Sequence, residues 1–555
     1  MDAPDGLPGP GSRWGFAVRR PVLASALAAA LLYLPWLAAA PVRGALEANR
    51  LVASREMLAR GDWVLPTLNG EPYLAKPPFQ YWLIEAVAGA SGLDVLVAGR
   101  LVSALAVIAL AATVAAYGRR VASSFAGLAA GLGVAIAGIV VEKGVVGELE
   151  TVLAAATAAA GLSFHLAVVD ARKRLLWIAA GGLALGAAFL TKGPVVLVFL
   201  LPAAVALAAA TPGARVRTIG VLLAQIGIGV AAAVPWVLAV LSRIGWSRAL
   251  SSSENEIFAR VHHAGASNAA PWWFYARGLP SALGPLLLLV PFLFVLPWRS
   301  ERRPRLLFLL AWAAVPVLLL SIPQGKETRY LIAGIPAWAL LLAEGLESAL
   351  AAGRLPRYRR ALRALAIALS WIAPAAALAA SFALPPPFRG AALAGGSLLF
   401  AARLLLSLPR VATPGATIPG ATFAVAASAA FLGLLGAKVL WARVYLAEAR
   451  ARRPEFDIAR RIAEALPPGR ELVVREYDAV LHLAVDRPLR VVADLRDLGP
   501  GTEATALVGS EAAGGQGWIE LGRSDLGSRG LRLIRREPSS SKRTPPETPA
   551  VFSLR

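Results

Sequence analysis

Apolar runs of about 20 residues recur along most of this 555-residue chain. A helix of that length crosses the hydrocarbon core of a bilayer and pairs all of its own backbone polar groups. The approximate runs are 21–42, 96–117, 123–141, 147–169, 174–190, 193–211, 217–242, 279–297, 305–322, 330–351, 361–383, 388–408 and 417–438. Only 16% of the residues are charged, against about 25% in ordinary soluble domains. The sequence therefore predicts a mainly α-helical, multi-pass membrane protein with about 13 transmembrane helices.

The net charge of +22 is concentrated in particular loops. Arginines gather in alternate loops between the apolar runs, among them RWGFAVRR, DARKR and PWRSERRPR. Because short cytoplasmic loops are rich in Lys and Arg, this pattern places the N-terminus in the cytoplasm. With an odd number of spans, the segment after about residue 441 then lies outside. The basic charge thus indicates membrane orientation, and we expect no nucleic-acid partner.

The predicted transmembrane domain covers 1–440 and carries two external loops long enough to hold structure, 43–95 and 243–278. Beyond it the composition becomes mixed, with an amphipathic helical segment, FDIARRIAEAL, and the strand-like runs ELVVREY, LRVVADL, ATALVGS, GWIELG and GLRLIRR. We expect 441–536 to form a small soluble α/β domain outside the membrane. The Pro-rich, polar segment 537–555 is expected to be a disordered tail. The chain has no Cys, so no disulfide supports these external parts.

This orientation places many of the unusual ionisable residues on the outer side of the membrane. They are Glu47, Glu56, Lys76, Glu148, Glu150, Lys192, His262, His263, Lys326 and Tyr330. Cations bind anionic headgroups, and carboxylates serve acid–base chemistry. Such a set at one membrane boundary suits a reaction on an anionic lipid.

Structural explanations compete with functional ones at several of these positions. Lys192, in LTKGP, is costly near a helix end unless it meets an anion or snorkels to the interface, and snorkelling is the more frequent case. Glu148 and Glu150 precede the fourth apolar run, where acidic residues stabilise a helix N-terminus through its dipole. His262 and His263 are adjacent and lack the spacing of metal ligands, so we expect no metal there.

Several motifs, in a fixed order, resemble a known family. They are the first-loop segment EANRLVASREMLARGDWVLPTLNGEPYLAKPPFQYW, then GELETVL, LTKGP, ENEIFARVHH followed by PWWFY, and GKETRYL. Together they resemble the bacterial aminoarabinose transferases, which are relatives of the protein O-mannosyltransferases in the GT-C superfamily. The resemblance covers about residues 14–350.

The resemblance implies an inverting glycosyltransferase at the outer face of the bacterial cytoplasmic membrane. Such an enzyme takes a sugar from a polyprenyl phosphate donor and gives it to a lipid or another envelope acceptor. It implies donor phosphate contacts for Lys76 and Tyr330, and we group Lys326 and Lys192 with them. A lysine in such a place can stabilise the charge that grows on the departing phosphate.

A carboxylate must orient the acceptor or take its proton. The family places an Asp-Glu pair after the first span for this purpose, and this chain has Leu46 and Glu47 there. Glu150 matches the family's acidic position at the start of the fourth span, so either Glu47 or Glu150 is the expected base. Further candidates for the substrate cavity are Glu148, Tyr73, Arg260 and His263.

The family's metal ligands are missing from this sequence. Aminoarabinose transferases have a Glu before the Lys-Pro motif and a His before the PWW-like segment, and these positions are Ala75 and Asn268 here. We therefore expect no metal or other cofactor. Because both ligands are missing, the resemblance indicates lipid A as the acceptor less strongly here than for the aminoarabinose transferases.

Two other classes of function are compatible with the composition. A transporter or flippase for a lipid-linked sugar would carry charged residues near helix midpoints and broken helices at the bilayer centre. The charges of this chain cluster instead at one boundary. A non-catalytic protein with the GT-C fold is the second alternative, because Leu46 replaces the family's aspartate.

Overall fold

The computed structural model describes residues 15–38, 42, 44–262 and 269–351, followed by shorter stretches of the C-terminal part. Those stretches are 472–474, 477–485, 488–492, 504–509, 518–524, 531–536 and 552–553. The chain divides into two compact units, residues 1–39 with 74–446, and residues 40–73 with 447–555. Each unit is described on its own.

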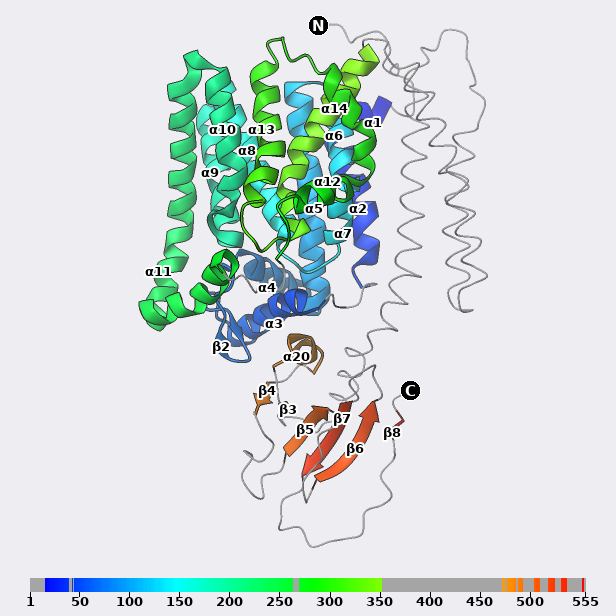
Figure 1. Ribbon diagram of the computed structural model, residues 1–555, viewed down its shortest axis with the longest axis vertical. Coiled ribbons are helices and arrows are strands. Elements are labelled where there is room, and N and C mark those ends of the chain that lie inside the picture. The colour runs from blue at the N-terminus through cyan, green and yellow to red at the C-terminus, as the bar shows by residue number, and fades with distance from the viewer. Residues whose placement is uncertain are drawn as a thin grey trace, which may run out of the picture. The chain divides into compact units, whose positions relative to one another are not determined.

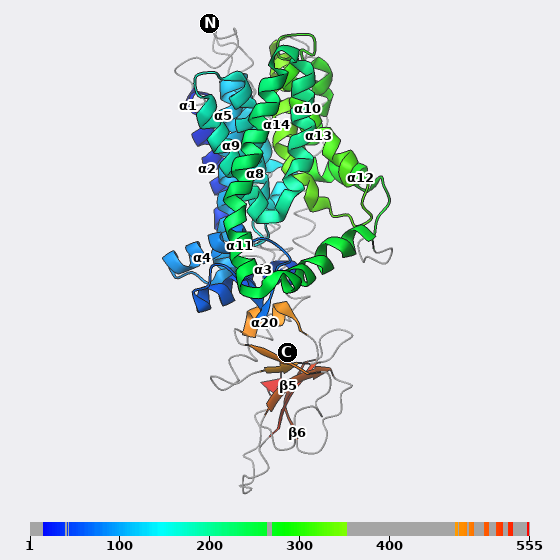
Figure 2. The same cartoon turned by 90° about the vertical axis from the view of Figure 1, so that its left-hand side faces the viewer.

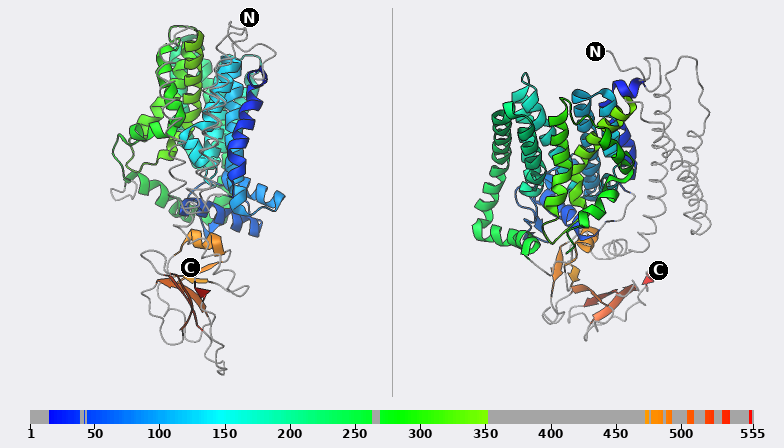
Figure 3. Two further views of the ribbon diagram at one scale, coloured as in Figure 1. Left: turned by 90° about the vertical axis from the view of Figure 1, so that its right-hand side faces the viewer. Right: turned by 45° about the horizontal axis from the view of Figure 1, so that its top comes forward.

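The first unit is a bundle of helices. Its elements are α1 (Gly15–Arg19), α2 (Pro21–Tyr33), η1 (Leu34–Trp36), α4 (Phe79–Ser91), α5 (Val95–Val121), α6 (Ser124–Ile136), α7 (Gly138–Lys143), α8 (Glu150–Val169), α9 (Arg174–Lys192), η2 (Gly193–Val196), α10 (Leu197–Ala210), η3 (Pro212–Ala214), α11 (Arg215–His262), α12 (Phe274–Leu283), η4 (Gly284–Val295), α13 (Arg303–Leu320), η5 (Thr328–Gly334) and α14 (Ile335–Ala351). The long helices run roughly parallel to one another in every view (Figures 1, 2 and 3).

Seven helices of the described part are long and apolar enough to cross a membrane. Two shorter apolar helices, Pro21–Trp36 and Ser124–Ile136, correspond to the first and third predicted runs. All runs predicted before residue 352 thus coincide with helices, whereas 361–383, 388–408 and 417–438 lie outside the described residues. The chain is a polytopic, mainly α-helical membrane protein, and the total of about 13 spans stays a prediction.

Breaks in the helices occur where glycine takes a positive φ. Gly193 has a φ of 70° and ends α9 directly after Lys192, before Pro194 begins the short η2. Gly245 has a φ of 76° inside α11, at a kink in that helix. Figure 2 shows that α11 is bent. Non-glycine residues rarely adopt such angles, so both bends follow from the local sequence.

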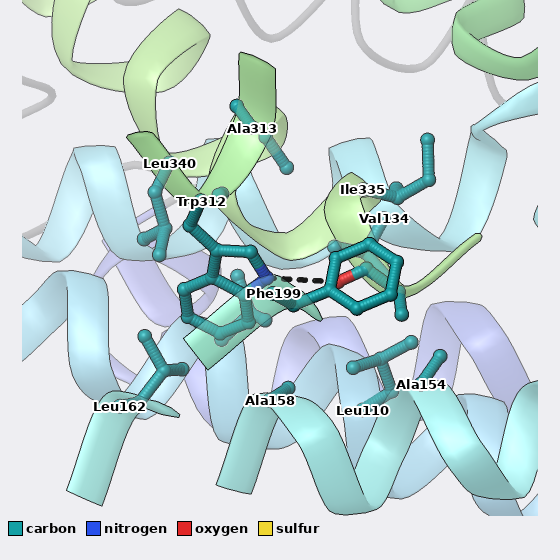
Figure 4. Packing of buried hydrophobic residues seen from close by; sticks show 14 of the residues in the cluster. Leu110, Val134, Ala154, Ala158, Leu162, Phe199, Trp312, Ala313, Ile335 and Leu340 are labelled. Atoms are coloured by element: carbon teal, nitrogen blue, oxygen red, sulfur yellow. Dashed lines mark hydrogen bonds between the residues drawn. The ribbon is translucent and has the colours of Figure 1, made fainter. Parts of the chain in front are cut away.

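The core of this unit combines alanines with larger aliphatic residues and a few aromatic ones, among them Phe199 and Trp312 (Figure 4). Trp312 of α13 is 1% exposed and donates its indole Nε1–H to the carbonyl of Ala333 in η5, at 3.0 Å. A Cβ on Gly161 of α8 would lie 2.8 Å from the Trp312 ring. Small residues let membrane helices approach closely, which is the main source of packing energy in a bilayer.

The packing of α5 against α6 is still closer. A Cβ on Gly127 of α6 would lie 2.6 Å from the carbonyl oxygen of Ala115 and 2.6 Å from the amide nitrogen of Arg119. Both of these atoms belong to the backbone of α5. The two helices therefore cross with backbone against backbone at Gly127.

A buried polar cluster lies toward the ends of α5 and α8 that are far from Glu150. The hydroxyl of Tyr117 and Nδ1 of His165 are 3.0 Å apart. Arg305 of α13 pairs with Glu344 of α14, Nη2 to Oε2 at 2.5 Å, and also donates to the carbonyl of Val121. Glu344 is 1% exposed. Buried charges are stable only when they are paired, so this pair fastens α13 to α14.

The second unit combines the first part of the loop 43–95 with the C-terminal segment. Its helices are α3 (Ala45–Arg60) and α20 (Ala479–Val485), and β1 (Thr67–Leu68) pairs with β2 (Glu71–Pro72). The other strands are β3 (Leu472–Val474), β4 (Leu489–Val491), β5 (Ala504–Gly509), β6 (Trp518–Ser524), β7 (Leu531–Arg536) and β8 (Phe552–Ser553). They form one sheet in the order β4-β3-β5-β7-β6-β8.

This sheet is mixed and starts with parallel pairs. β3 is parallel to both β4 and β5, and β7 is antiparallel to β5 and β6. All five predicted strand-like runs coincide with β3 to β7, and the predicted helix at 456–466 lies outside the described residues. Of the predicted tail 537–555 the structure describes only Phe552–Ser553, which pair with β6 as β8, and the disorder of the tail stays a prediction. Phe552 follows the polar part of that segment and is a residue type favoured in strands.

Hydrogen bonds from side chains to backbone fasten the loop segment of this unit to its C-terminal part. Arg55 of α3 donates to the carbonyls of Leu483 and His482 at 3.0 and 2.9 Å. Asn69 donates to the carbonyl of Leu489 at 2.6 Å and accepts from its amide at 2.8 Å. Glu56 holds the turn that carries Asn69 by accepting from its amide at 2.6 Å.

Candidate active site

Two buried carboxylates, Glu148 and Glu150, lie at the N-terminus of α8. Hydrogen bonds hold the loop before this helix in place. The loop 144–149 joins α7 to α8, and its carbonyls accept hydrogen bonds from two neighbouring helices. Gln80 of α4 donates to Gly147 at 3.1 Å, and Ser103 of α5 donates to Val146 at 2.6 Å. Glu148 and Glu150 are thereby placed at one end of the bundle.

Each of these carboxylates contacts at least two cations. Oε1 of Glu150 lies 3.3 Å from Nζ of Lys192 and 3.4 Å from Nε of Arg329. Oε2 of Glu148 lies 3.3 Å from Nη1 of Arg329 and 3.4 Å from Nζ of Lys143. Glu150 is 3% exposed and Glu148 is 6% exposed, so their charges depend on this pairing.

Tyr330 completes this cluster with its ring. Nζ of Lys192 lies 4.3 Å from the ring centroid of Tyr330, and the guanidinium carbon of Arg329 lies 5.9 Å from it. An ammonium within about 6 Å of an aromatic face is attracted to it. The structure therefore brings together four of the sequence-predicted residues, namely Glu148, Glu150, Lys192 and Tyr330. Lys192 does not simply extend to the interface, because a carboxylate and a ring contact it.

Lys326 lies close in sequence to Tyr330 but makes different contacts. Its Nζ donates to the carbonyl of Ala270 at 2.8 Å and to that of Pro323 at 2.6 Å, and the residue is 5% exposed. Lys326 thus ties the start of the α12 segment to the loop before η5. A phosphate contact for Lys326 stays a prediction, and two of its three N–H donors serve the backbone.

Lys76 belongs to the same unit as this cluster. It is half-buried, and its Nζ donates to the carbonyl of Ala75 at 2.5 Å. Pro77 and Pro78 follow, and α4 begins at Phe79. Because Gln80 of the same helix is bonded to Gly147, one short segment links Lys76 to the acidic loop.

Two of the predicted residues belong to the other unit. Glu47 lies in the first turn of α3 and is fully buried, whereas the preceding Leu46 is 38% exposed. Tyr73 accepts a hydrogen bond from Nη1 of Arg50 at 3.0 Å. The exposed Leu46 shows that the residue at the family's aspartate position is not part of the hydrophobic core.

The remaining candidates lie at the edge of what the structure describes. Arg260 is on α11, and only its backbone is described. His263 and Asn268 fall outside the described residues. Their predicted roles stay predictions.

The metal prediction can be compared with the donor atoms present. Ala75 has only a methyl side chain, so it cannot act as a ligand where the family has Glu. Among the residues that the structure describes, no group of three or more His, Cys, Asp or Glu could hold a metal ion. The absence of a metal from the reaction stays a prediction.

Sequence reasoning missed Arg329 and Gln80. Arg329 is the residue through which Glu148 and Glu150 are linked, and Gln80 holds the loop between them and α4. The only signal for Arg329 was its place beside Tyr330 in GKETRYL, a segment whose lysine attracted attention first. Nothing in the local pattern marked Gln80.

Comparisons with known proteins agree with this picture. The family described as dolichyl-phosphate-mannose-protein mannosyltransferase matches residues 75–239. An undecaprenyl phosphate-alpha-4-amino-4-deoxy-L-arabinose arabinosyl transferase from Serratia proteamaculans is 32% identical over 346 residues, which is 59% of each chain. A protein of the same name from Pseudomonas savastanoi pv. phaseolicola is 31% identical over 316 residues, 54% of this chain and 56% of the relative. The chain therefore spans somewhat more than half the length of the curated relatives it matches.

Solved structures extend the likeness to the fold. ArnT from Cupriavidus metallidurans bound to undecaprenyl phosphate superposes with a TM-score of 0.72 at 22% identity, over 94% of this chain and 98% of that chain. The same protein in the apo state gives a TM-score of 0.72 at 21% identity. The resemblance predicted from the sequence is thus confirmed, and the chain is ArnT-like, with the GT-C fold of ArnT and a sequence related to the arabinosyl transferases.

Proposed function

We propose that this protein is a glycosyltransferase that takes a sugar from a polyprenyl phosphate donor. The acceptor is a lipid or another glycan of the envelope, and the reaction occurs at the outer face of the bacterial cytoplasmic membrane. Similar proteins named arabinosyl transferases use an undecaprenyl phosphate sugar, and ArnT was solved with undecaprenyl phosphate bound. The observation that carries the proposal is the cluster of Lys192, Glu150 and Tyr330 at one end of an ArnT-like bundle.

The chemistry of the transfer assigns a task to each kind of residue. A hydroxyl oxygen of the acceptor attacks the anomeric carbon of the sugar, and the bond from that carbon to the phosphate oxygen breaks. The bonding electrons leave with the phosphate, and the hydroxyl proton passes to a carboxylate, Glu150 or Glu47. A single displacement of this kind inverts the configuration of the sugar.

Cations stabilise the phosphate as it gains charge. Lys192 is suited to this because it already lies between a carboxylate and the Tyr330 ring, from which its flexible side chain can turn to a stronger anion. Lys76 begins the segment that Gln80 fastens to the acidic loop, and it supplies a second point charge. Together with this function we propose that the N-terminus lies in the cytoplasm and that the C-terminal segment lies outside.

A variant of Lys192 tests the proposal. The purified protein is incubated with undecaprenyl phosphate-linked 4-amino-4-deoxy-L-arabinose and an extract of envelope lipids, and released undecaprenyl phosphate is measured by mass spectrometry. We expect Lys192→Met to lower kcat/KM by roughly 100-fold, because one preorganised charge is worth about that much at such a site. Lys173→Met is the matched control, since Lys173 is exposed at the opposite end of α9 and should retain normal turnover.

Two results would overturn the proposal. One is the absence of product with any polyprenyl phosphate sugar in the presence of the full lipid extract. The other is equal turnover by Lys192→Met and Lys173→Met. Mass spectrometry of envelope lipids from a deletion strain then names the sugar and the acceptor.

We further propose that transfer requires no divalent metal. The methyl side chain of Ala75 removes a ligand from the position where the family has Glu. Turnover should therefore be unchanged after dialysis against EDTA. A loss that added Zn²⁺ restores would contradict this.

A further inference from the structure

Two segments of the first unit lie side by side, one directly before α12 and the other before η5. Ala269 and Gly325 form an antiparallel β-bridge. The amide of Ala270 donates to the carbonyl of Gln324 at 3.2 Å. A pairing of two strands is at most marginally stable by itself, and this one is very short. Side chains must therefore add to it if the two segments are to keep their places.

Lys326 strengthens this pairing with its side chain. Its Nζ donates to the carbonyl of Ala270 in the other segment at 2.8 Å, and to that of Pro323 in its own segment at 2.6 Å. The ammonium is buried, and a buried charged donor is stable only when it is hydrogen-bonded. Hydrogen bonds from a charged donor are also roughly twice as strong as those between neutral groups. Lys326 therefore fixes the path of the backbone at the point where the chain turns toward η5.

Tyr275 of α12 holds the next residue of the same loop. The amide of Glu327 donates to the hydroxyl of Tyr275 at 3.2 Å, and the Tyr275 side chain is fully buried. The carbonyl of Glu327 accepts in turn from the amide of Tyr330 at 3.0 Å, in the first turn of η5. Glu327 thus connects Tyr275 directly to the backbone of Tyr330.

The helix η5 depends on such outside contacts for its position. It is a short 3-10 helix, a form whose own hydrogen bonds have poorer geometry than those of an α-helix. Near its end, the carbonyl of Ala333 accepts from the indole of Trp312. Its start is held by the bonds of Lys326 and Tyr275 to the preceding loop. The place of the Tyr330 ring, which lies in the first turn, therefore follows from those bonds.

We propose that Lys326 and Tyr275 are positioning residues of the transfer reaction, which set the place of Tyr330 beside Lys192 by fixing the loop before η5. This inference rests on the proposed function, in which a polyprenyl phosphate binds at the cluster of Lys192, Glu150 and Tyr330. It gives Lys326 a task other than the phosphate contact expected from its motif. Because the two residues act through the backbone of η5, their hydrogen bonds matter more than the charge of the lysine.

The test is a double-mutant cycle in the undecaprenyl phosphate release assay. We expect Lys326→Met to lower kcat/KM by roughly 100-fold, because a misplacement of about 1 Å at a reacting site can cost that much. Tyr330→Phe should lower it by roughly 10- to 100-fold, since it removes a hydroxyl expected to bond the charged phosphate. If Lys326 acts through Tyr330, the double variant should be no worse than the more impaired single variant. Lys173→Met is again the control and should retain normal turnover, since Lys173 is exposed at the opposite end of α9.

Lys326→Gln separates the hydrogen bonds of the lysine from its charge. The glutamine amide can donate to a carbonyl but carries no charge. We expect kcat/KM of Lys326→Gln to exceed that of Lys326→Met by roughly 3- to 10-fold, which is the contribution of one hydrogen bond.

Tyr275→Phe is the second, gentler variant, because it removes only the hydroxyl that accepts from the Glu327 amide. It should also lower kcat/KM, and its effect should likewise not multiply with that of Tyr330→Phe. If Lys326→Met does not accumulate as folded protein, the cycle is carried out with Tyr275→Phe.

Three results would contradict the inference and leave the proposed function intact. The first is a double variant whose loss is the product of the two single losses, as expected for an independent phosphate contact or for a general loss of stability. The second is equal kcat/KM for Lys326→Gln and Lys326→Met, which would assign the effect to the charge. The third is normal kcat/KM in both Lys326→Met and Tyr275→Phe. Absence of turnover by the wild-type protein would instead overturn the proposed function and this inference together.

Discussion

Replacing Gly127 by alanine tests how closely α5 and α6 are packed. The new Cβ would lie 2.6 Å from the Ala115 carbonyl oxygen and 2.6 Å from the Arg119 amide nitrogen, whereas ordinary contacts begin at 3.4 Å. Both atoms are backbone, so no side chain can turn away. The helices must separate by about 0.8 Å at this crossing, because that is the missing distance.

The size of the effect follows from two opposing contributions. Forcing an extra carbon into a well-packed site costs typically about 1–3 kcal/mol. Alanine is also a better helix former than glycine by about 0.8–1.0 kcal/mol. Gly220→Ala in α11 is the matched control, because a Cβ there meets nothing within 4 Å and shows the propensity gain alone. We expect Gly127→Ala to be less stable than Gly220→Ala by about 1–3 kcal/mol.

The assay is unfolding by SDS titration in mixed micelles, followed by circular dichroism. The free energy of unfolding is compared between the two variants and the wild-type protein. Equal free energies for Gly127→Ala and Gly220→Ala, or a more stable Gly127→Ala, would refute the close crossing of α5 and α6. A difference in the expected direction confirms that the glycine is required by contact with backbone.

Two further predictions concern the other end of the bundle. Glu344→Leu leaves Arg305 without its buried partner and should lower the free energy of unfolding by about 3–5 kcal/mol. The double variant with Arg305→Met should recover most of this loss in the same SDS titration. A double variant no more stable than Glu344→Leu would contradict the pairing. The Trp177 indole, which donates to Asp170 at 3.1 Å, and the nearby backbone N–H groups and Arg120 hold the pKa of the Asp170 carboxyl below its ordinary value. The stability that Asp170 adds over Asp170→Asn should therefore be complete above about pH 4 and decline as the pH falls further, and a difference in Tm that does not depend on pH would count against it.

Much of the membrane part could be predicted from the sequence because a single physical requirement governs it. A span must be apolar over about 20 residues, and this pattern is local. The break after Lys192 could also be predicted, since the pair Gly193-Pro194 disfavours an uninterrupted α-helix. The resemblance to the aminoarabinose transferases rested on short motifs in order, and the comparisons confirm it.

The partners of individual side chains could not be predicted in the same way. Lys326 and Arg329 lie in one short motif, and the sequence predicted an anion contact for Lys326 alone. In the structure Lys326 donates to two backbone carbonyls, and Arg329 contacts three carboxylates. The direction of each side chain depends on how η5 begins. Distances between α8, α9 and η5 depend on packing, and no spacing in the sequence encodes them.

The bond between Asn69 and Leu489 has a consequence for the time at which the second unit can form. The two residues are 420 positions apart, and both bonds of the Asn69 carboxamide go to the backbone of Leu489. At synthesis rates of about 5–20 residues per second, Leu489 leaves the ribosome roughly 20–80 s after Asn69. During that interval α3 and its turn have no C-terminal strands to bind. The second unit can thus be completed only after Leu489 has been made, long after its residues 40–73.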